Sequence, residues 1–218
     1  VKGVNTTIST SDFLYTNATM LSSSKGGAIY VEGNGTNIST STFNRGSSHY
    51  GGAIYIDGER AIVEKSSFRE FTVTNDGGAI YINGHDALIH KSNFTQSNAN
   101  RGGMIYIVGD DANITSSVFD RSHTTHEGGA LYIAGVNAYV GSSRFSRHNA
   151  TLGGALYISG ENTYISGSDF NMSHASGVAG GVYLGGTNTT IYNSTFNLNT
   201  AYRGGAIYNN GGTAIVMY

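Results

Sequence analysis

Apolar and polar residues alternate in short segments along the whole chain. In Ala28-Ile29-Tyr30-Val31 the alternation places Ile29 and Val31 on one face and Ala28 and Tyr30 on the other. We expect the isoleucine face to be buried. No window keeps the i, i+3, i+4, i+7 stripe of an amphipathic helix, and β-branched and aromatic residues dominate the regular segments. The pattern therefore predicts strands and no helices.

These segments recur with a fixed period. One pair of adjacent glycines opens each repeat, with spacings of 24 to 27 residues, and these pairs begin at Gly26, Gly51, Gly77, Gly102, Gly128, Gly153, Gly180 and Gly204. A phenylalanine recurs in step at Phe13, Phe43, Phe68, Phe94, Phe119, Phe145, Phe170 and Phe196. Each of these has a serine two positions before it and an isoleucine or valine five positions before it. One repeat therefore reads GGAIYI, a third Gly, I-x-x-S-x-F and a variable polar segment that we expect to be a loop.

Three short extended segments in about 25 residues, separated by corners, are typical of one coil of a parallel β-helix, whose coils stack about 4.8 Å apart. The glycine excess, 32 of 218 residues, supplies the corners that need a positive φ or a close backbone approach. We therefore predict an all-β chain, a single β-helix domain over residues 1–218 with about 8.5 coils. Neither end carries a recognisable cap, so we expect both terminal coils to be open.

Two further expectations concern packing. The columns that contain Ile29, Val31, Ile38 and Phe43 should form continuous buried stacks. The coil at Gly180 should be irregular, because Gly-Gly-Val-Tyr lacks one residue of the GGAIY pattern and follows a longer polar segment.

Composition narrows the function classes. Twelve Lys and Arg against fourteen Asp and Glu give a net charge of −2, and no basic tract exists that could neutralise a run of phosphates, so nucleic-acid binding is not expected. Apolar stretches are too short for a membrane span. The absence of cysteine excludes disulfides, thiolate metal sites and cysteine nucleophiles.

The tyrosines of the repeat lie on the face opposite the buried isoleucines. We expect them to form an outer aromatic ladder of Tyr30, Tyr55, Tyr81, Tyr106, Tyr132, Tyr157, Tyr183 and Tyr208. Such a ladder either stacks on itself or offers a docking stripe for carbohydrate or a neighbouring chain.

Other polar columns suggest little chemistry. The stacked serines are expected to be structural. The acidic column Glu32, Asp57, Asn83 lapses after three coils and is expected to be a solvated edge rather than a catalytic or cation site. His123, His126, His148 and His174 fall in the polar segments and are expected to be surface residues rather than metal ligands. We predict no catalytic residue, no metal and no cofactor.

Ten N-x-S/T sequons are about twice the number that random placement gives. They are candidates for glycosylation at Asn5, Asn17, Asn34, Asn37, Asn93, Asn113, Asn149, Asn171, Asn188 and Asn193. The corner and loop positions Asn17, Asn34, Asn149 and Asn171 should be modified first, and sequons beside the I-x-x-S-x-F strand should be less accessible. Alternatively, Asn, Ser and Thr simply crowd the same turns.

The GGAIY and GGALY repeats followed by I-x-x-S-x-F resemble those of right-handed β-helix surface proteins of the pectin-lyase-like superfamily. They are similar in particular to chlamydial polymorphic-membrane-protein passengers, whose motifs are GGA[ILV] and FxxN. Phe196-Asn197-Leu198-Asn199 reads FxxN. The resemblance covers the whole chain and implies a right-handed β-helix. It is less specific for function, because the superfamily includes polysaccharide lyases, tailspikes, adhesins and passive stalks.

We therefore expect an extracellular structural or self-associating module of a cell-surface protein, such as a stalk, sheath, filament subunit or adhesin passenger. Its open ends should abut further segments of a longer chain or copies of itself stacked head to tail. Carbohydrate is a possible partner. The alternative is a polysaccharide-acting lyase or hydrolase.

Overall fold

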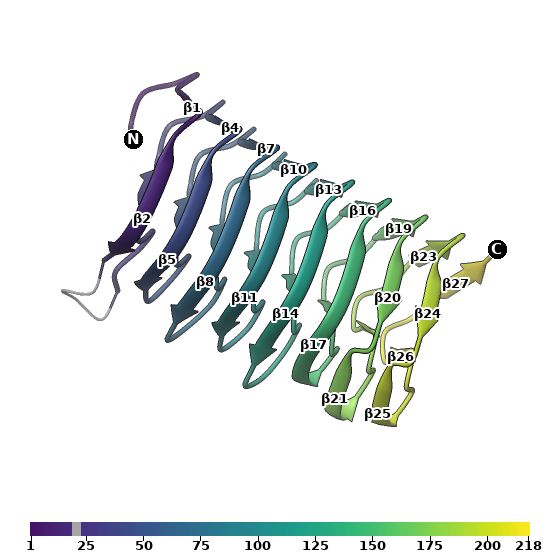
Figure 1. Cartoon of the computed structure of the whole chain (residues 1–218). Coiled ribbons are helices and arrows are strands. Elements are labelled where there is room, and N and C mark those ends of the chain that lie inside the picture. The colour runs from purple at the N-terminus through teal and green to yellow at the C-terminus, as the bar shows by residue number, and fades with distance from the viewer. Residues whose placement is uncertain (19–22) are drawn as a thin grey trace.

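The computed structural model describes residues 1–18 and 23–218, and these form one right-handed parallel β-solenoid of about eight coils, as predicted. The coils lie side by side, with the N-terminus at one end of the stack and the C-terminus at the other (Figure 1). Each coil contributes strands to three parallel sheets. No helix long and apolar enough to cross a bilayer occurs in the described part of the chain.

The first sheet has nine strands and carries the buried isoleucine and valine of the I-x-x-S-x-F segment. Its strands are β1 (Thr7–Ser9), β4 (Asn37–Ser39), β7 (Ile62–Glu64), β10 (Leu88–His90), β13 (Asn113–Thr115), β16 (Tyr139–Gly141), β19 (Tyr164–Ser166), β23 (Thr189–Tyr192) and β27 (Ala214–Met217).

The second sheet has ten strands and carries the phenylalanines. Its strands are β2 (Asp12–Asn17), β5 (Thr42–Ser48), β8 (Ser67–Val73), β11 (Asn93–Ala99), β14 (Val118–Thr124), β17 (Arg144–Leu152), β20 (Asp169–Asn171), β21 (His174–Val178), β24 (Thr195–Asn197) and β25 (Thr200–Arg203).

The third sheet has eight strands and carries the GGAIYI segments. Its strands are β3 (Ile29–Val31), β6 (Ile54–Ile56), β9 (Ile80–Ile82), β12 (Ile105–Ile107), β15 (Leu131–Ile133), β18 (Leu156–Ile158), β22 (Val182–Leu184) and β26 (Ile207–Asn209).

The polar segment after each phenylalanine is not a loop. In most coils it continues the strand of the second sheet past a single bend two residues after the phenylalanine, as at Gln96, where φ is 55°. Beyond the bend, small side chains such as Ala99 and Ala150 point inward and are buried. The expectation was wrong because the inward positions here are small or polar, as at Ser97 and Ala99, which removes the apolar alternation that marks a strand.

The expected buried columns are confirmed. The rings of the eight repeating phenylalanines stack face to face along the solenoid, with centroids 4.7 to 4.9 Å apart and interplanar angles of at most 10°. From Phe43 to Phe170 they are at most 1% exposed. The isoleucines and valines of the first and third sheets complete the core.

Glycines serve two different needs at the corners. The first glycine of the pair adopts a positive φ, 61° at Gly51. The third glycine is needed for close approach, because a Cβ at Gly84 would lie 2.1 Å from the carbonyl oxygen of Gly58 in the preceding coil.

The expectation for the coil at Gly180 is wrong in one detail. Strand β22 pairs with β18 in register, Tyr157 opposite Tyr183, so no residue is missing from it. Ala179, with φ 63°, takes the place of the first glycine, and Gly181 takes the place of the usual alanine. The irregularity that was expected lies just before, where the pairing of β21 shifts register between Ala175 and Val178.

Candidate functional site

The tyrosines of the third sheet form one continuous ladder. From Tyr55 to Tyr208 the rings stack with centroids 4.5 to 5.7 Å apart and interplanar angles of 4 to 20°, and Tyr30 meets Tyr55 edge to face. The ladder is less exposed than an outer stripe would be. Tyr55, Tyr106 and Tyr183 are 6 to 8% exposed, and the other five are half-buried.

A flanking column covers the ladder. It consists of the residue before each glycine corner: Lys25, Tyr50, Asp76, Arg101, Glu127, Leu152, Val178 and Arg203. The guanidinium of Arg101 lies 4.9 Å from the ring centre of Tyr106 and 5.4 Å from that of Tyr132, and the ammonium of Lys25 lies 4.2 Å from that of Tyr55. Cations placed over ring faces are attracted by the negative face of the π system. The sequence analysis missed this column because its members share no chemical type.

The ion pair of Arg101 with Asp76 fixes the middle of this column. Arg101 Nε and Nη2 donate to the two oxygens of Asp76 at 3.0 and 2.7 Å, and the Asp76 side chain is 6% exposed. The carboxylate beside it raises the pKa of Arg101, so the guanidinium stays charged. Burial raises the pKa of Tyr55 and Tyr81 to about 12, so these two phenols stay neutral well above physiological pH.

The serine column is structural. Ser117 Nα–H donates to the hydroxyl of Ser143 in the next coil at 3.2 Å, and the Ser117 hydroxyl donates to the carbonyl of Thr115 at 2.9 Å. The same hydrogen bond, from the amide of one serine to the hydroxyl of the serine in the next coil, repeats without a break from Ser11 to Ser194. Each hydroxyl therefore satisfies backbone groups at a corner where the sheet ladder is interrupted.

The carboxylates of the acidic column each have a polar or charged partner. Asp57 accepts hydrogen bonds from the Tyr30 hydroxyl at 2.8 Å and from Asn83 Nδ2 at 3.1 Å, while Glu32 pairs with Lys2 at 3.1 Å. The hydrogen bond to Asp57 is the main reason that the pKa of Tyr30 is raised. These partners fit a polar edge.

The four histidines that were considered as metal ligands do not form a cluster. His123, His126 and His174 are exposed, and no group of three His, Cys, Asp or Glu side chains within residues 1–18 and 23–218 could hold a metal ion. His148, expected at the surface, is completely buried. It occupies the inward column three residues after the phenylalanine, whose other members are mostly small.

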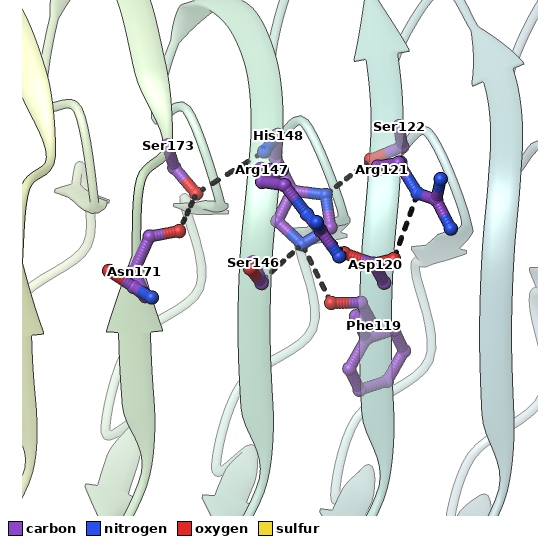
Figure 2. A network of polar contacts seen from close by, with 9 residues as sticks. All are labelled: Phe119, Asp120, Arg121, Ser122, Ser146, Arg147, His148, Asn171 and Ser173. Carbon is purple, nitrogen blue, oxygen red and sulfur yellow. Dashed lines mark hydrogen bonds and ion pairs between the residues drawn. The ribbon is translucent and has the colours of Figure 1, made fainter.

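Figure 2 shows the network around His148. Its Nδ1 lies 2.7 Å from Ser122 Oγ, and its Nε2 lies 3.0 Å from Ser146 N and 3.1 Å from the carbonyl oxygen of Phe119. The Ser122 hydroxyl in turn donates to the carbonyl of Gly129. All these partners are neutral, and burial lowers the pKa of His148 to about 3. The imidazole is therefore neutral and is shielded from solvent, which does not suit a catalytic base.

The outer face of the second sheet bears a shallow trough of about 950 Å³. It is lined by side chains on either side of the buried phenylalanines, from Ser67, Asn93, Thr95, Val118, Asp120, Arg144, Ser146, Arg147, Asp169, Asn171, Met172, Thr195 and Asn197. Arg147 Nε and Nη2 donate to one oxygen of Asp120 at 2.9 and 2.6 Å, and Arg121 Nε donates to the other at 2.9 Å (Figure 2). Three coils away, Arg45 and Arg69 hold Glu70 in the same manner. Sequence reasoning missed both clusters because it treated the polar segments as loops.

The sequons divide by exposure. Six of the asparagines are exposed: Asn5, Asn17, Asn93, Asn149, Asn188 and Asn193. Four are half-buried: Asn34, Asn37, Asn113 and Asn171. The expected order of accessibility is therefore wrong for Asn34 and Asn171, and also for Asn93 and Asn193, which lie beside the I-x-x-S-x-F strand yet are exposed. Asn34 is held because its side-chain oxygen accepts from Glu59 N at 2.9 Å.

Comparison with known proteins gives one family match. The Chlamydia polymorphic membrane protein repeat matches residues 193–210, which include the FxxN motif of β24 and the glycine corner before β26. No curated protein and no solved structure matches the chain. The repeat and the solenoid fold together fit a β-helical module of a surface or outer-membrane-associated protein.

Proposed function

We propose that the chain is an extracellular structural module of a cell-surface protein, acting as a stalk, sheath, filament subunit or adhesin passenger and not as an enzyme. The observation that carries this proposal is the match of a surface-protein repeat to residues 193–210 within a solenoid whose core columns run unbroken from coil to coil. A chain built of one repeated coil gives a stiff rod and a long lateral surface.

The polar networks support the same role. The serine column, the Arg101–Asp76 pair and the buried His148 all satisfy groups within or between neighbouring coils. At the ends of the described chain, β1 and β27 each pair on one side only, and further coils of a longer chain or copies stacked head to tail would supply their partners.

Surface labelling tests this proposal. Intact cells of the source organism would be treated with protease or with an antibody against the chain, and a cytoplasmic protein would serve as the control for lysis. We expect cleavage or labelling on intact cells. Full protection on intact cells, with cleavage only after lysis, would refute an extracellular position.

A polysaccharide-acting enzyme of the pectin-lyase-like superfamily is the second candidate. The trough on the second sheet favours it, because Asp120 and Asp169 lie among hydroxyl, amide and arginine side chains that suit sugars. Incubation with a library of acidic and neutral polysaccharides tests it. Release of reducing ends that disappears in Asp120→Asn and Asp169→Asn would establish this activity over the structural role.

A further inference from the structure

Most arginines lie on one surface of the solenoid, and half of the acidic side chains lie on another. Five of the eight arginines project from the outer face of the second sheet: Arg45, Arg69, Arg121, Arg144 and Arg147. Seven of the fourteen acidic residues lie at the corner between the third and first sheets: Glu32, Asp57, Glu59, Asp86, Asp110, Asp111 and Glu161. We call these two surfaces the arginine face and the acidic corner.

The arginine face also holds four carboxylates, those of Asp12, Glu70, Asp120 and Asp169, and Asp169 lies 3.9 Å from Arg144. In its two clusters the arginines are more exposed than the carboxylates. The side chains of Arg121 and Arg147 are 54% and 52% exposed, whereas Asp120 between them is only 14% exposed. Glu70 is likewise withdrawn, at 26%, behind Arg45 and Arg69. One carboxylate serves two guanidiniums in each cluster, so each cluster keeps a net positive charge and free N–H donors.

Three of the seven carboxylates at the acidic corner have a cationic partner: Glu32 pairs with Lys2, Asp57 with Lys25 and Glu59 with Arg60. Asp86, Asp111 and Glu161 are exposed and make no ion pair within the described residues. Asp110 lies 3.5 Å from His85 and accepts a hydrogen bond from Val136 N at 2.8 Å. Asp86 and Asp111 occupy the same position in adjacent coils, which are spaced about 5 Å apart, so their charges repel and an opposing cation would relieve that repulsion.

The two surfaces share one period and do not lie next to each other. The chain runs from the first sheet to the second and then to the third, so the acidic corner is the corner that the second sheet does not touch. Two copies with parallel axes can therefore place the corner of one on the face of the other. Shifted by one coil, about 4.8 Å, Asp86 would face Arg121 and Asp111 would face Arg147.

We infer that copies of this chain associate side by side, with the acidic corner of one copy on the arginine face of the next. The contact is heterologous, so it leaves a corner and a face free at the two sides and can extend into a sheet of rods. This inference rests on the proposed structural role and names its partner as a second copy. It differs from head-to-tail stacking, which uses the ends of the solenoid.

Charge-swapped variants test the inference. Arg121→Glu/Arg147→Glu makes the face acidic, and Asp86→Lys/Asp111→Lys makes the corner basic. The fold accommodates both kinds of side chain at these positions. Glu70 stands at the position equivalent to Arg121, and Arg60 at the position equivalent to Asp86, and all four residues have a positive φ. The control Lys65→Glu/Lys91→Glu changes the net charge as much as the arginine variant does but alters the corner between the first and second sheets.

Association would be measured by sedimentation equilibrium, with circular dichroism to verify folding. We expect wild type and the control to associate at about 0.01 M ionic strength and to dissociate at about 1 M. Each swapped variant alone should bind itself at least about tenfold more weakly than wild type, and an equimolar mixture of the two should recover association.

Three results would overturn the inference: a wild type that stays monomeric at low salt, swapped variants that associate like wild type, or a mixture that stays monomeric. None of these bears on surface exposure, so the proposed function would stand or fall separately by the labelling experiment.

Discussion

Ala179 occupies a backbone conformation that glycine occupies in the other coils. Its φ is 63°, whereas the equivalent residues of the neighbouring coils are Gly153 and Gly204, with φ 62° and 61°. A side chain in the left-handed region costs about 1–2 kcal/mol, because Cβ crowds the following carbonyl oxygen. Ala179 is completely buried, so its Cβ cannot escape into solvent.

We therefore expect Ala179→Gly to stabilise the protein by about 0.5–1 kcal/mol, since the relief of strain exceeds the entropy that glycine adds to the unfolded chain. Urea unfolding would measure the change. Ala175→Gly is the matched control, because Ala175 is equally buried but does not have a positive φ, and it should destabilise the protein. A loss of stability in Ala179→Gly would show that this corner is not strained.

His148 makes stability depend on pH. Its pKa is about 3 in the folded protein, because burial disfavours the imidazolium; Asp120 acts in the opposite direction and Arg147 in the same direction. The unfolded chain has the ordinary value of about 6.5 and so binds the proton first. The full contribution of the neutral imidazole is present above about pH 6.5 and is lost progressively as the pH falls towards 3.

Replacing His148 by Asn should remove this pH dependence. Asn199, in the same column, donates from Nδ2 to the carbonyl of Phe170 at 2.9 Å, so an amide is accommodated there. Between pH 6.5 and 5 the unfolding free energy of the wild type should fall by about 1.6 kcal/mol more than that of His148→Asn. Urea titrations at several pH values test this, and the exposed His126→Asn should keep the wild-type slope. Parallel slopes for wild type and His148→Asn would contradict the prediction.

Among the elements, the phenylalanine stack of the second sheet offers the sharpest test of packing. Phe119 is completely buried between Phe94 and Phe145, with ring centroids 4.9 and 4.8 Å away. Phe119→Ala should lower the free energy of unfolding by about 3–5 kcal/mol, because the fixed coil spacing prevents the cavity from collapsing. Phe196 is half-buried in the last coil that has a phenylalanine, so Phe196→Ala should lower the free energy of unfolding by less. Equal losses in the two variants, read from thermal unfolding, would show that the coils do not restrain one another.

The elements could be predicted from the sequence wherever an apolar residue marks every second position. The strands around Ile29 and Phe43 are of this kind, and the fixed spacing of their repeats indicated the solenoid. The second half of the second-sheet strands could not be recognised, because its inward side chains are small or polar, such as Ala99, Ser97 and His148. Backbone pairing between coils holds these residues, and pairing depends on neighbours 25 residues away rather than on local pattern.

Across the whole molecule, exposure decides which sequons could carry glycans. Asn149 is exposed, whereas Asn37 and Asn113 have buried side-chain oxygens without a hydrogen-bond partner. In natively purified protein we expect a glycan at Asn149 and none at Asn113. Intact-mass analysis should show a decrease with Asn149→Gln and no change with Asn113→Gln beyond the residue itself. A native mass equal to that of the bare 218-residue chain would refute glycosylation.

The candidate surfaces could be predicted only in part, because they depend on which side of each coil a residue lies. The tyrosine ladder follows from the repeat, but its cover by Arg101 and Lys25 depends on residues that differ from coil to coil. The arginine face and the acidic corner become visible only when each charge is assigned to a side of the coil. In the linear sequence the two signs are intermixed.

The stacking of coils has a mechanical consequence. Apart from the two ends, each coil is held by the coil before it and the coil after it, and the strands of all three sheets pair only with neighbours about 25 residues away. Tension applied to the two ends of the chain would therefore unfold the coils one at a time. Each unfolded coil would add about 85 Å of chain length as its 25 residues extend. Under load the rod would lengthen in even steps and would absorb work at every step, as a shock-absorbing tether does.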